Sequence, residues 1–103
     1  MSGHDAVGVS IVAQHVGHIR LQRPPHNFFS LDLIEGIADA LDALDADDDC
    51  RVVVLSAEGK NFCAGADFSA SAAGYTTAEL YAAAVRLFRT RKPIVAAVQG
   101  AAI

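Results

Sequence analysis

The stretch that decides the fold is Lys60-Asn61-Phe62-Cys63-Ala64-Gly65-Ala66-Asp67-Phe68, which comes soon after the apolar run Val52-Val53-Val54-Leu55. An apolar run without alternation is typical of a central strand covered on both faces. Small residues at 64–66 let a ligand approach the main chain closely, and backbone N–H groups in such a loop can hold an oxyanion. The stretch therefore predicts a binding loop that needs no nucleophile. A plain tight turn relieved by Gly65 is the alternative.

The residues before this loop predict a hairpin and a helix. Residues 7–14 and 16–23 alternate between apolar and polar side chains, which indicates two strands that turn near Gln14 and His15. Pro24-Pro25 ends the second strand, because proline cannot donate to a sheet. Ser30 is a suitable N-cap for a helix that extends to about Ala46.

The residues after the loop predict a second helix and a last strand. Thr76 and Glu79 form a capping box, which indicates a helix that runs to Arg91. Its apolar stripe is predicted to contain Leu80, Ala83, Ala84, Leu87 and Phe88. Pro93 then opens the final strand. The order ββ-α-β-α-β with short connections predicts an α/β fold whose last two strands are parallel.

Two further segments extend the pattern set by the loop. Leu21-Gln22-Arg23-Pro24-Pro25-His26-Asn27-Phe28-Phe29 precedes it, and Ala97-Val98-Gln99-Gly100-Ala101-Ala102-Ile103 follows it. In this order, and from about residue 9 to residue 103, the chain resembles the enoyl-CoA hydratase/isomerase (crotonase) superfamily. The first segment is one residue shorter than the commoner family form. The resemblance implies the crotonase-like (ClpP/crotonase) fold of repeated ββα units, with residues 1–103 as the N-terminal portion of a single domain.

The resemblance also implies a function. It is that of an acyl-CoA-binding enzyme of fatty acid metabolism that stabilises a thioester enolate in a backbone oxyanion hole, as enoyl-CoA hydratases (lyases) and isomerases do. The backbone N–H of Ala66 would be one donor. Coenzyme A would be part of the substrate, no permanently bound cofactor or metal is expected, and a homo-oligomer (a trimer or a dimer of trimers) is implied. The residues implied to line the substrate and coenzyme A site are His26, Phe28, Ala64, Gly65, Ala66, Asp67 and Phe68.

The end of the sequence leaves other functions open. Ile103 ends an apolar segment, and a strand that ended there would expose apolar surface and an unpaired edge. We therefore expect a truncated domain, inactive by itself, because the glycine-rich second loop and the catalytic carboxylates of the family would follow Ile103. A non-catalytic acyl-CoA-binding or assembly fragment is one alternative. Another crotonase-fold reaction, such as a thioesterase, dehalogenase or decarboxylase reaction, is a second.

Composition excludes several classes of protein. With 103 residues, 52% hydrophobic residues and a net charge of −4, the chain fits one globular domain with no basic field for nucleic acid. Apolar runs are shorter than the roughly 20 residues of a membrane span, and no signal pattern begins the sequence. A cytoplasmic protein is expected. Cys50 and Cys63 are expected to be reduced.

Four side-chain groups invite other interpretations. Asp45, Asp47, Asp48 and Asp49 do not fit an EF-hand, since Cys50 and Ser56 replace its glycine and glutamate, so a solvated turn is predicted. His15 and His18 are expected on opposite faces of a strand, which disfavours zinc.

A thiol nucleophile at Cys63 with His26 as base is disfavoured, because no Asn or Asp is evidently placed to orient the histidine. The cations Arg86, Arg89, Arg91 and Lys92 are predicted to complement the helix end, with attraction of coenzyme A phosphates as the alternative.

Overall fold

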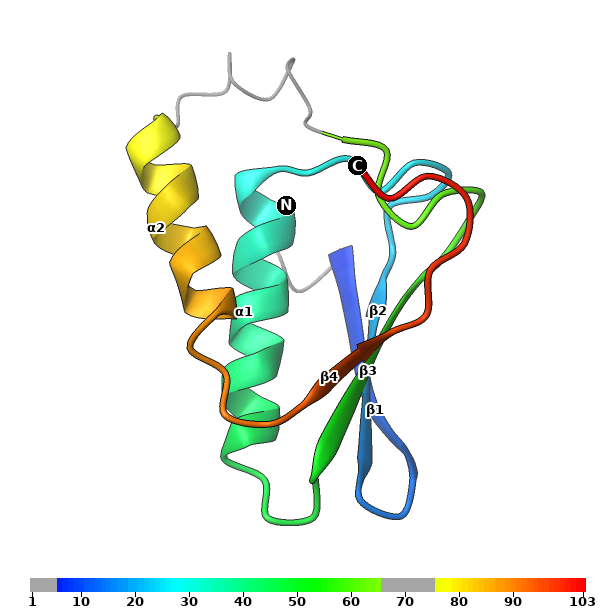
Figure 1. Ribbon diagram of the computed structural model, residues 1–103, viewed down its shortest axis with the longest axis vertical. Helices are drawn as coiled ribbons and strands as arrows, with labels where there is room; N and C mark the ends of the chain where they lie inside the picture. Colours follow the sequence, from blue (N-terminus) through cyan, green and yellow to red (C-terminus); the bar gives the residue numbers. More distant parts are fainter. Residues whose placement is uncertain (1–5, 66–75) are drawn as a thin grey trace.

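The chain folds into a four-stranded sheet with two helices. The computed structural model describes residues 6–65 and 76–103 (Figure 1). In chain order the elements are β1 (Val7–Ala13), β2 (Val16–Leu21), α1 (Leu31–Asp45), β3 (Val52–Ala57), α2 (Thr77–Leu87) and β4 (Ile94–Ala96). This order confirms the predicted succession of elements.

The sheet begins with the predicted hairpin. Strands lie in the order β1-β2-β3-β4, with β1 antiparallel to β2 and the remaining neighbours parallel. The hairpin turns at His15, whose φ of 67° lies in the left-handed region. His15 is therefore a turn residue, which confirms the predicted turn near Gln14 and His15, whereas the expectation that His15 and His18 lie on opposite faces of one strand is wrong. The predicted parallel pairing of the last two strands is confirmed.

Helix α1 forms the core with the sheet. The Ser30 hydroxyl accepts a hydrogen bond from the Leu33 N–H at 3.3 Å, which confirms the predicted N-cap. The apolar face of the helix packs against β1 and β2. Each fully buried leucine or isoleucine side chain stabilises the fold by about 1.5–3 kcal/mol. The buried cluster contains Ala6, Val7, Ile19, Leu21, Leu33, Ile37, Ala40, Leu41, Leu44, Cys50 and Val53.

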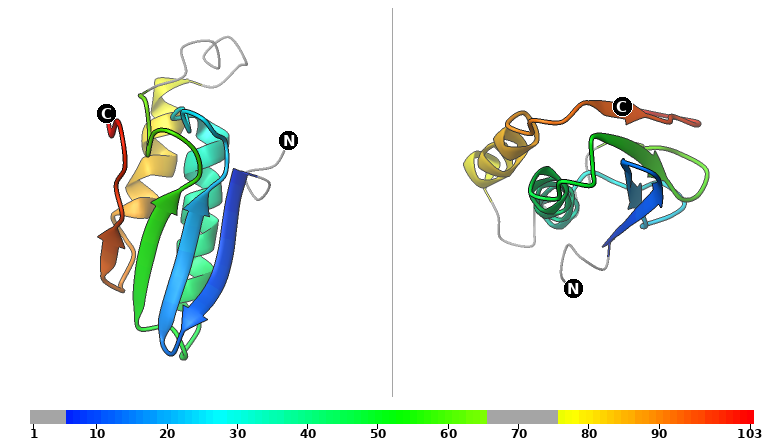
Figure 2. Two further views of the ribbon diagram at one scale, coloured as in Figure 1. Left: turned by 90° about the vertical axis from the view of Figure 1, so that its right-hand side faces the viewer. Right: turned by 90° about the horizontal axis from the view of Figure 1, so that it is seen from below.

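Strand β3 lies inside the sheet but is covered unequally. It pairs with β2 on one side and β4 on the other. Val53 is fully buried, whereas Val52 and Val54 are half-buried. Figure 2 shows both helices on the same side of the sheet. Within the described residues, the predicted cover on both faces is therefore wrong, because an apolar run reports only that a strand can be buried.

Helix α2 begins as predicted and ends earlier. The Thr76 hydroxyl accepts from the Glu79 N–H at 3.1 Å, and the Glu79 carboxylate accepts from the Thr76 N–H at 3.2 Å. The last helical residue is Leu87, four positions before the predicted end at Arg91. Phe88 is the C-cap and is 87% exposed, so its assignment to the apolar stripe of the helix is also wrong.

Helix α2 is an outer layer. It packs chiefly against α1, and Figure 2 shows α1 between α2 and the hairpin strands. Ala83 is its buried residue. Strand β4 follows Pro93, as predicted, and is short and exposed. Neither α1 nor α2 has the length and apolar character that would be needed to cross a membrane.

Candidate functional site

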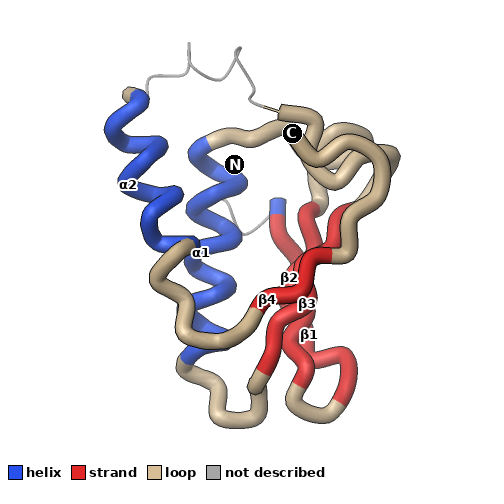
Figure 3. Tube along the Cα trace, viewed as in Figure 1, coloured by secondary structure: helices blue, strands red, loops and turns tan. Residues whose placement is uncertain are grey.

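Three connecting segments meet at the carboxyl ends of the parallel strands. Residues 22–30 follow β2, residues 58–65 follow β3, and residues 97–103 follow β4. Figure 3 shows these segments as loops gathered at one end of the sheet. In open α/β sheets, ligands bind outside the carboxyl ends of the strands. The topology therefore makes this loop cluster the candidate site.

Backbone hydrogen bonds hold the middle segment on both sides. The Ala64 N–H donates to the His26 carbonyl at 2.9 Å, and the Phe29 N–H donates to the Gly65 carbonyl at 2.7 Å. On the other side, the Cys63 N–H donates to the Ala101 carbonyl at 3.0 Å, and Cys63 pairs with the last segment in a parallel bridge. The backbone that leads into the predicted binding loop is consequently fixed by both neighbours.

Asn27 is the buried junction between the first two segments. It is fully buried and has a φ of 48°. Its Oδ1 accepts from the Arg23 N–H at 2.8 Å, and its Nδ2 donates to the Glu58 carbonyl at 2.7 Å and the Asn61 carbonyl at 2.9 Å. An amide has both donors and acceptors, so one side chain satisfies backbone groups of both segments. Sequence reasoning did not identify this role.

Asn61 joins all three segments. Its backbone N–H donates to the Pro25 carbonyl at 3.0 Å, and its Oδ1 accepts from the Ala101 N–H at 3.0 Å. Its Nδ2 lies 2.9 Å from Nδ1 of His26. Gly100 makes room for this junction, since a Cβ there would overlap the Lys60 carbonyl and approach Oδ1 of Asn61 at 2.7 Å. The φ of Gly100, +59°, also favours glycine.

The predicted site residues that the structure describes lie together. His26 is half-buried, Phe28 is 43% exposed, and their ring centroids are 5.2 Å apart at an interplanar angle of 47°. Ala64 and Gly65 are half-buried beside them, and Gly65 has a φ of +110°, which disfavours other residues. The remaining predicted residues, Ala66, Asp67 and Phe68, lie outside the described residues.

The geometry argues against thiol catalysis for a reason other than the predicted one. Cys63 is a free, half-buried cysteine whose backbone takes part in the pairing described above. The expectation that no asparagine orients His26 is wrong, because Asn61 contacts its ring. Among the described residues, however, Cys63 Sγ makes no hydrogen bond with that ring. No local signal in the sequence marks the contact between Asn61 and His26, because the two residues lie 35 positions apart.

The other polar candidates have structural partners. Asp45 accepts from the Thr90 hydroxyl at 3.1 Å and from the Arg91 N–H at 3.1 Å, so it is not the solvated side chain that was predicted. His15 Nδ1 contacts the Asp49 carbonyl at 3.0 Å, and His18 Nε2 lies 2.5 Å from the Ser56 hydroxyl. Within residues 6–65 and 76–103, no group of three or more His, Cys, Asp or Glu is placed to hold a metal ion.

The cations that follow α2 complement the end of α1. Lys92 Nζ donates to the Leu44 and Asp47 carbonyls, and the Arg91 guanidinium donates to the Asp45 carbonyl at 3.3 Å. These contacts lie near the amino ends of β3 and β4, at the opposite end of the sheet from the loop cluster (Figure 1). The prediction assigned these two residues to the end of the second helix, and that assignment is wrong, because their contacts are with the end of α1 and the turn after it. This position disfavours a role in binding coenzyme A phosphates.

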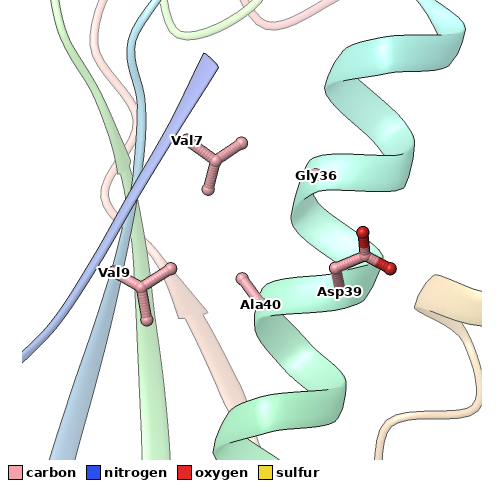
Figure 4. A pocket seen from close by; sticks show the side chains of 5 residues that line it. All are labelled: Val7, Val9, Gly36, Asp39 and Ala40. Atoms are coloured by element: carbon pink, nitrogen blue, oxygen red, sulfur yellow. The ribbon is translucent and has the colours of Figure 1, made fainter. Parts of the chain in front are cut away.

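A separate pocket lies between β1 and α1. It has a volume of about 320 Å³ and is lined by Val7, Val9, Gly36, Asp39 and Ala40. Figure 4 shows the side chains of Val7, Val9 and Ala40 directed into this space. Its lining is mostly apolar and comes from β1 and α1, and although Val7 pairs with Leu21 at the carboxyl end of β2, no lining residue belongs to the three connecting segments. It is therefore not part of the loop cluster.

Comparison with known proteins identifies the family. The chain shares its fold with solved structures such as subunit I of an enoyl-CoA hydratase from Geobacillus kaustophilus HTA426, with a TM-score of 0.82, 31% identity and coverage of 92% of this chain and 38% of that one. The family model for enoyl-CoA hydratase/isomerase matches residues 12–103. The chain therefore belongs to the enoyl-CoA hydratase/isomerase family, which confirms the resemblance and its crotonase-like fold.

Curated relatives agree with this assignment. A peroxisomal Delta(3,5)-Delta(2,4)-dienoyl-CoA isomerase of Arabidopsis thaliana is 32% identical over 107 residues, covering 85% of this chain and 38% of the isomerase. A probable enoyl-CoA hydratase of Bacillus subtilis (strain 168) is 32% identical over 99 residues, covering 89% of this chain and 38% of the relative. The chain thus spans well under half the length of these relatives.

Proposed function

We propose that this chain forms one wall of the active site in an acyl-CoA enzyme of the enoyl-CoA hydratase or isomerase type. The observation that carries the proposal is the position of Ala64 and Gly65. Their backbone is held by residues 26–29 at the carboxyl ends of parallel strands, where the small-residue loop begins. Such a fixed backbone supports an oxyanion site, because donors that are already oriented cost no reorganisation when charge develops.

The proposed chemistry is stabilisation of a thioester enolate. The backbone N–H of Ala66 would donate to the thioester oxygen together with a second backbone N–H. Carboxylates would then add water across a double bond or move a proton. His26, Phe28, Ala64, Asp67 and Phe68 would line the acyl and coenzyme A site. Coenzyme A enters as part of the substrate, and the proposal includes no permanently bound cofactor.

The oxyanion role can be tested at Ala66 in the natural full-length protein. Ala66→Pro removes the N–H and is expected to lower kcat for crotonyl-CoA hydration by about 10²–10³. Ala66→Gly keeps the N–H and serves as the matched control, with a rate near that of the wild type. Loss of enoyl-thioester absorbance measures the rate, and circular dichroism checks that both variants fold. Equal activity in the two variants would exclude this donor.

The cysteine alternative predicts the reverse pattern. Cys63→Ser and Cys63→Ala are expected to have little effect, because a small residue is sufficient beside the loop. Loss of turnover in both cysteine variants, with activity retained in Ala66→Pro, would establish thiol catalysis instead. Binding of crotonyl-CoA without turnover in the wild type would favour a non-catalytic acyl-CoA-binding protein. A cytoplasmic location and a trimer or dimer of trimers stay predictions.

A further inference from the structure

We propose that Asn61 is a positioning residue that holds the His26 imidazole with its proton on Nε2, so that this N–H donates to an acceptor oxygen of the bound acyl-CoA. The inference rests on the proposed function, because the ligand it names is the thioester substrate. It assigns a hydrogen bond to the His26 side chain, which the proposed function names only as part of the lining. The juxtaposition that carries it is Asn61 between His26 and Ala101.

The orientation of the Asn61 amide is determined by a backbone donor. The Ala101 N–H can only donate, so the atom of Asn61 that lies 3.0 Å from it must be the oxygen. The NH₂ group is then the one that faces Nδ1 of His26, at 2.9 Å. The backbone of Asn61 is itself held by hydrogen bonds with Pro25 and Asn27. The amide therefore has one orientation that satisfies its neighbours.

This orientation selects the tautomer of His26. An NH₂ group has no lone pair available for accepting, so Nδ1 of the ring must act as the acceptor. A neutral imidazole that accepts at Nδ1 carries its proton on Nε2. The Asn61 side chain thus makes Nε2–H a donor, in the same way that the hydrogen bond at one ring nitrogen sets the role of the other.

The Nε2–H group is available to a ligand. Within the described residues, the His26 ring makes no hydrogen bond other than the one with Asn61. Among those residues no buried side-chain nitrogen or oxygen lacks a partner, so Nε2 reaches solvent. The His26 carbonyl accepts from the Ala64 N–H, which places this residue beside the start of the small-residue loop. The donor consequently stands at the edge of the proposed substrate site.

An acyl-CoA offers two kinds of acceptor oxygen to such a donor. One is the amide carbonyl of the pantetheine arm, and the other is a phosphate of the nucleotide. Either accepts from a neutral N–H, and the adjacent Phe28 ring, 5.2 Å away between centroids, supplies an apolar surface next to the contact. A comparison of crotonyl-CoA with S-crotonyl-pantetheine, which lacks the nucleotide, distinguishes the two sources.

The test is Asn61→Asp in the full-length protein. A carboxylate has the same shape and still accepts from the Ala101 N–H, but toward His26 it presents an acceptor. At about pH 9, where an ordinary imidazole is neutral, the proton should therefore move to Nδ1. Nitrogen NMR of labelled histidine is expected to show Nε2–H in the wild type and Nδ1–H in the variant. Nδ1–H in the wild type would overturn the proposal.

Binding provides the second measurement. Asn61→Asp and His26→Phe are each expected to weaken crotonyl-CoA binding about tenfold, as loss of one hydrogen bond does, with kcat changed less than KM. The double variant should lose no more than either single one, because both remove the same contact. His15→Phe, in the hairpin turn at the other end of the sheet, is the control and should bind normally. If the losses persist with S-crotonyl-pantetheine, the acceptor is the pantetheine carbonyl.

Other outcomes separate this inference from the proposed function. Unchanged affinity in both single variants, or fully additive losses in the double variant, would show that Asn61 only joins the loops. Melting temperatures reveal whether Asn61→Asp acts through stability. If the wild type binds no crotonyl-CoA and no free coenzyme A, the proposed function fails. The tautomer measured by NMR would then still decide whether Asn61 controls His26.

Discussion

Helices α1 and α2 both begin at a hydroxyl N-cap, yet they are held in different ways. Helix α1 buries an apolar face against β1 and β2. Helix α2 buries Ala83, whereas its residues Tyr81 and Val85 are 67% and 44% exposed and its C-cap Phe88 is 87% exposed. The residues that α1 buries are Leu33, Ile34, Gly36, Ile37, Ala38, Ala40, Leu41 and Leu44.

The second helix and the turn after it are attached through a polar seam. Asp39, Asp42 and Asp45 follow one side of α1 at intervals of three residues. Arg86 binds the first two at 2.8 and 2.7 Å, while the Thr90 hydroxyl binds the third. Exposed ion pairs contribute about 0.2–1 kcal/mol each, less than one buried leucine. An amphipathic sequence therefore predicts a helix more securely than it predicts how much of that helix is buried.

The largest effect is expected from matched truncations in the two helices. Leu41, near the middle of α1, is 3% exposed, and Tyr81, near the middle of α2, is 67% exposed. Leu41→Ala should lower the free energy of unfolding by about 2–5 kcal/mol, because it leaves a cavity in the core. Tyr81→Ala should change it by less than about 0.5 kcal/mol. Urea unfolding measures both, and a comparable loss at Tyr81 would show that α2 is covered in solution.

An intermediate effect is expected at the end of α1. Lys92 donates to the Leu44 and Asp47 carbonyls, which also accept from the N–H groups of Asp47 and Cys50, so its ammonium adds a charged donor to the turn that ends α1. Lys92→Met keeps the length of the side chain and should cost about 1–2 kcal/mol in the free energy of unfolding. The control is Arg89→Met, since Arg89 is exposed and its guanidinium has no hydrogen bond or ion pair with the described residues. Thermal unfolding that is equal in both variants would contradict the capping role.

The smallest effect is expected at the ion pairs of the seam. Hydrogen bonds to Asp39, which has the larger effect, and to Asp42 raise the pKa of Arg86 above its usual range. A raised pKa means that the contribution is complete below the ordinary pKa of arginine and is lost only as pH rises through the higher value. Because the Arg86 side chain is 38% exposed, Arg86→Gln should cost only about 0.5 kcal/mol.

Salt provides the control for the Arg86 variant. The difference in stability between Arg86→Gln and the wild type should shrink in about 1 M salt, where the Debye length is about 3 Å. It should be the same at pH 7 and pH 9, since arginine stays charged at both. A difference that is independent of salt would indicate that Arg86 acts through packing of its stem and not through its charge.

Much of the fold followed from local signals. The Ser30 cap, the Thr76 and Glu79 capping box and the hairpin alternation each act over a few residues, so they could be recognised in the sequence and are confirmed. The end of α2 was predicted four residues too late. Arg91 and Lys92 were assigned to that helix, but they bind Asp45 and Leu44 at the end of α1, which lie 46 and 48 positions earlier in the chain. Long-range polar contacts of this kind leave no periodic pattern in the sequence.

The candidate site could be predicted only in part, because some of its contacts also join residues that are distant in the sequence. The grouping of His26 and Phe28 with Ala64 and Gly65 rested on a family resemblance, and the structure places these residues side by side. The link from Asn61 to His26 was missed because it joins residues 35 positions apart. Neither residue type signals such a pairing locally. Only the topology, which brings the carboxyl ends of β2, β3 and β4 together, shows that they meet.

The buried amide of Asn27 has a consequence for how the lengths of these loops can change in this chain. Surface loops commonly tolerate insertions independently of one another. Here the segment after β2 is bonded through Asn27 to Glu58 and Asn61 in the segment after β3, and Asn61 is bonded in turn to Ala101. A residue gained or lost in 24–29 would displace all three partners at once. A change in the length of one of these loops is therefore expected to preserve the fold only if the other two loops change with it. Replacing a single loop with that of a relative should prevent folding, whereas replacing all three together should not.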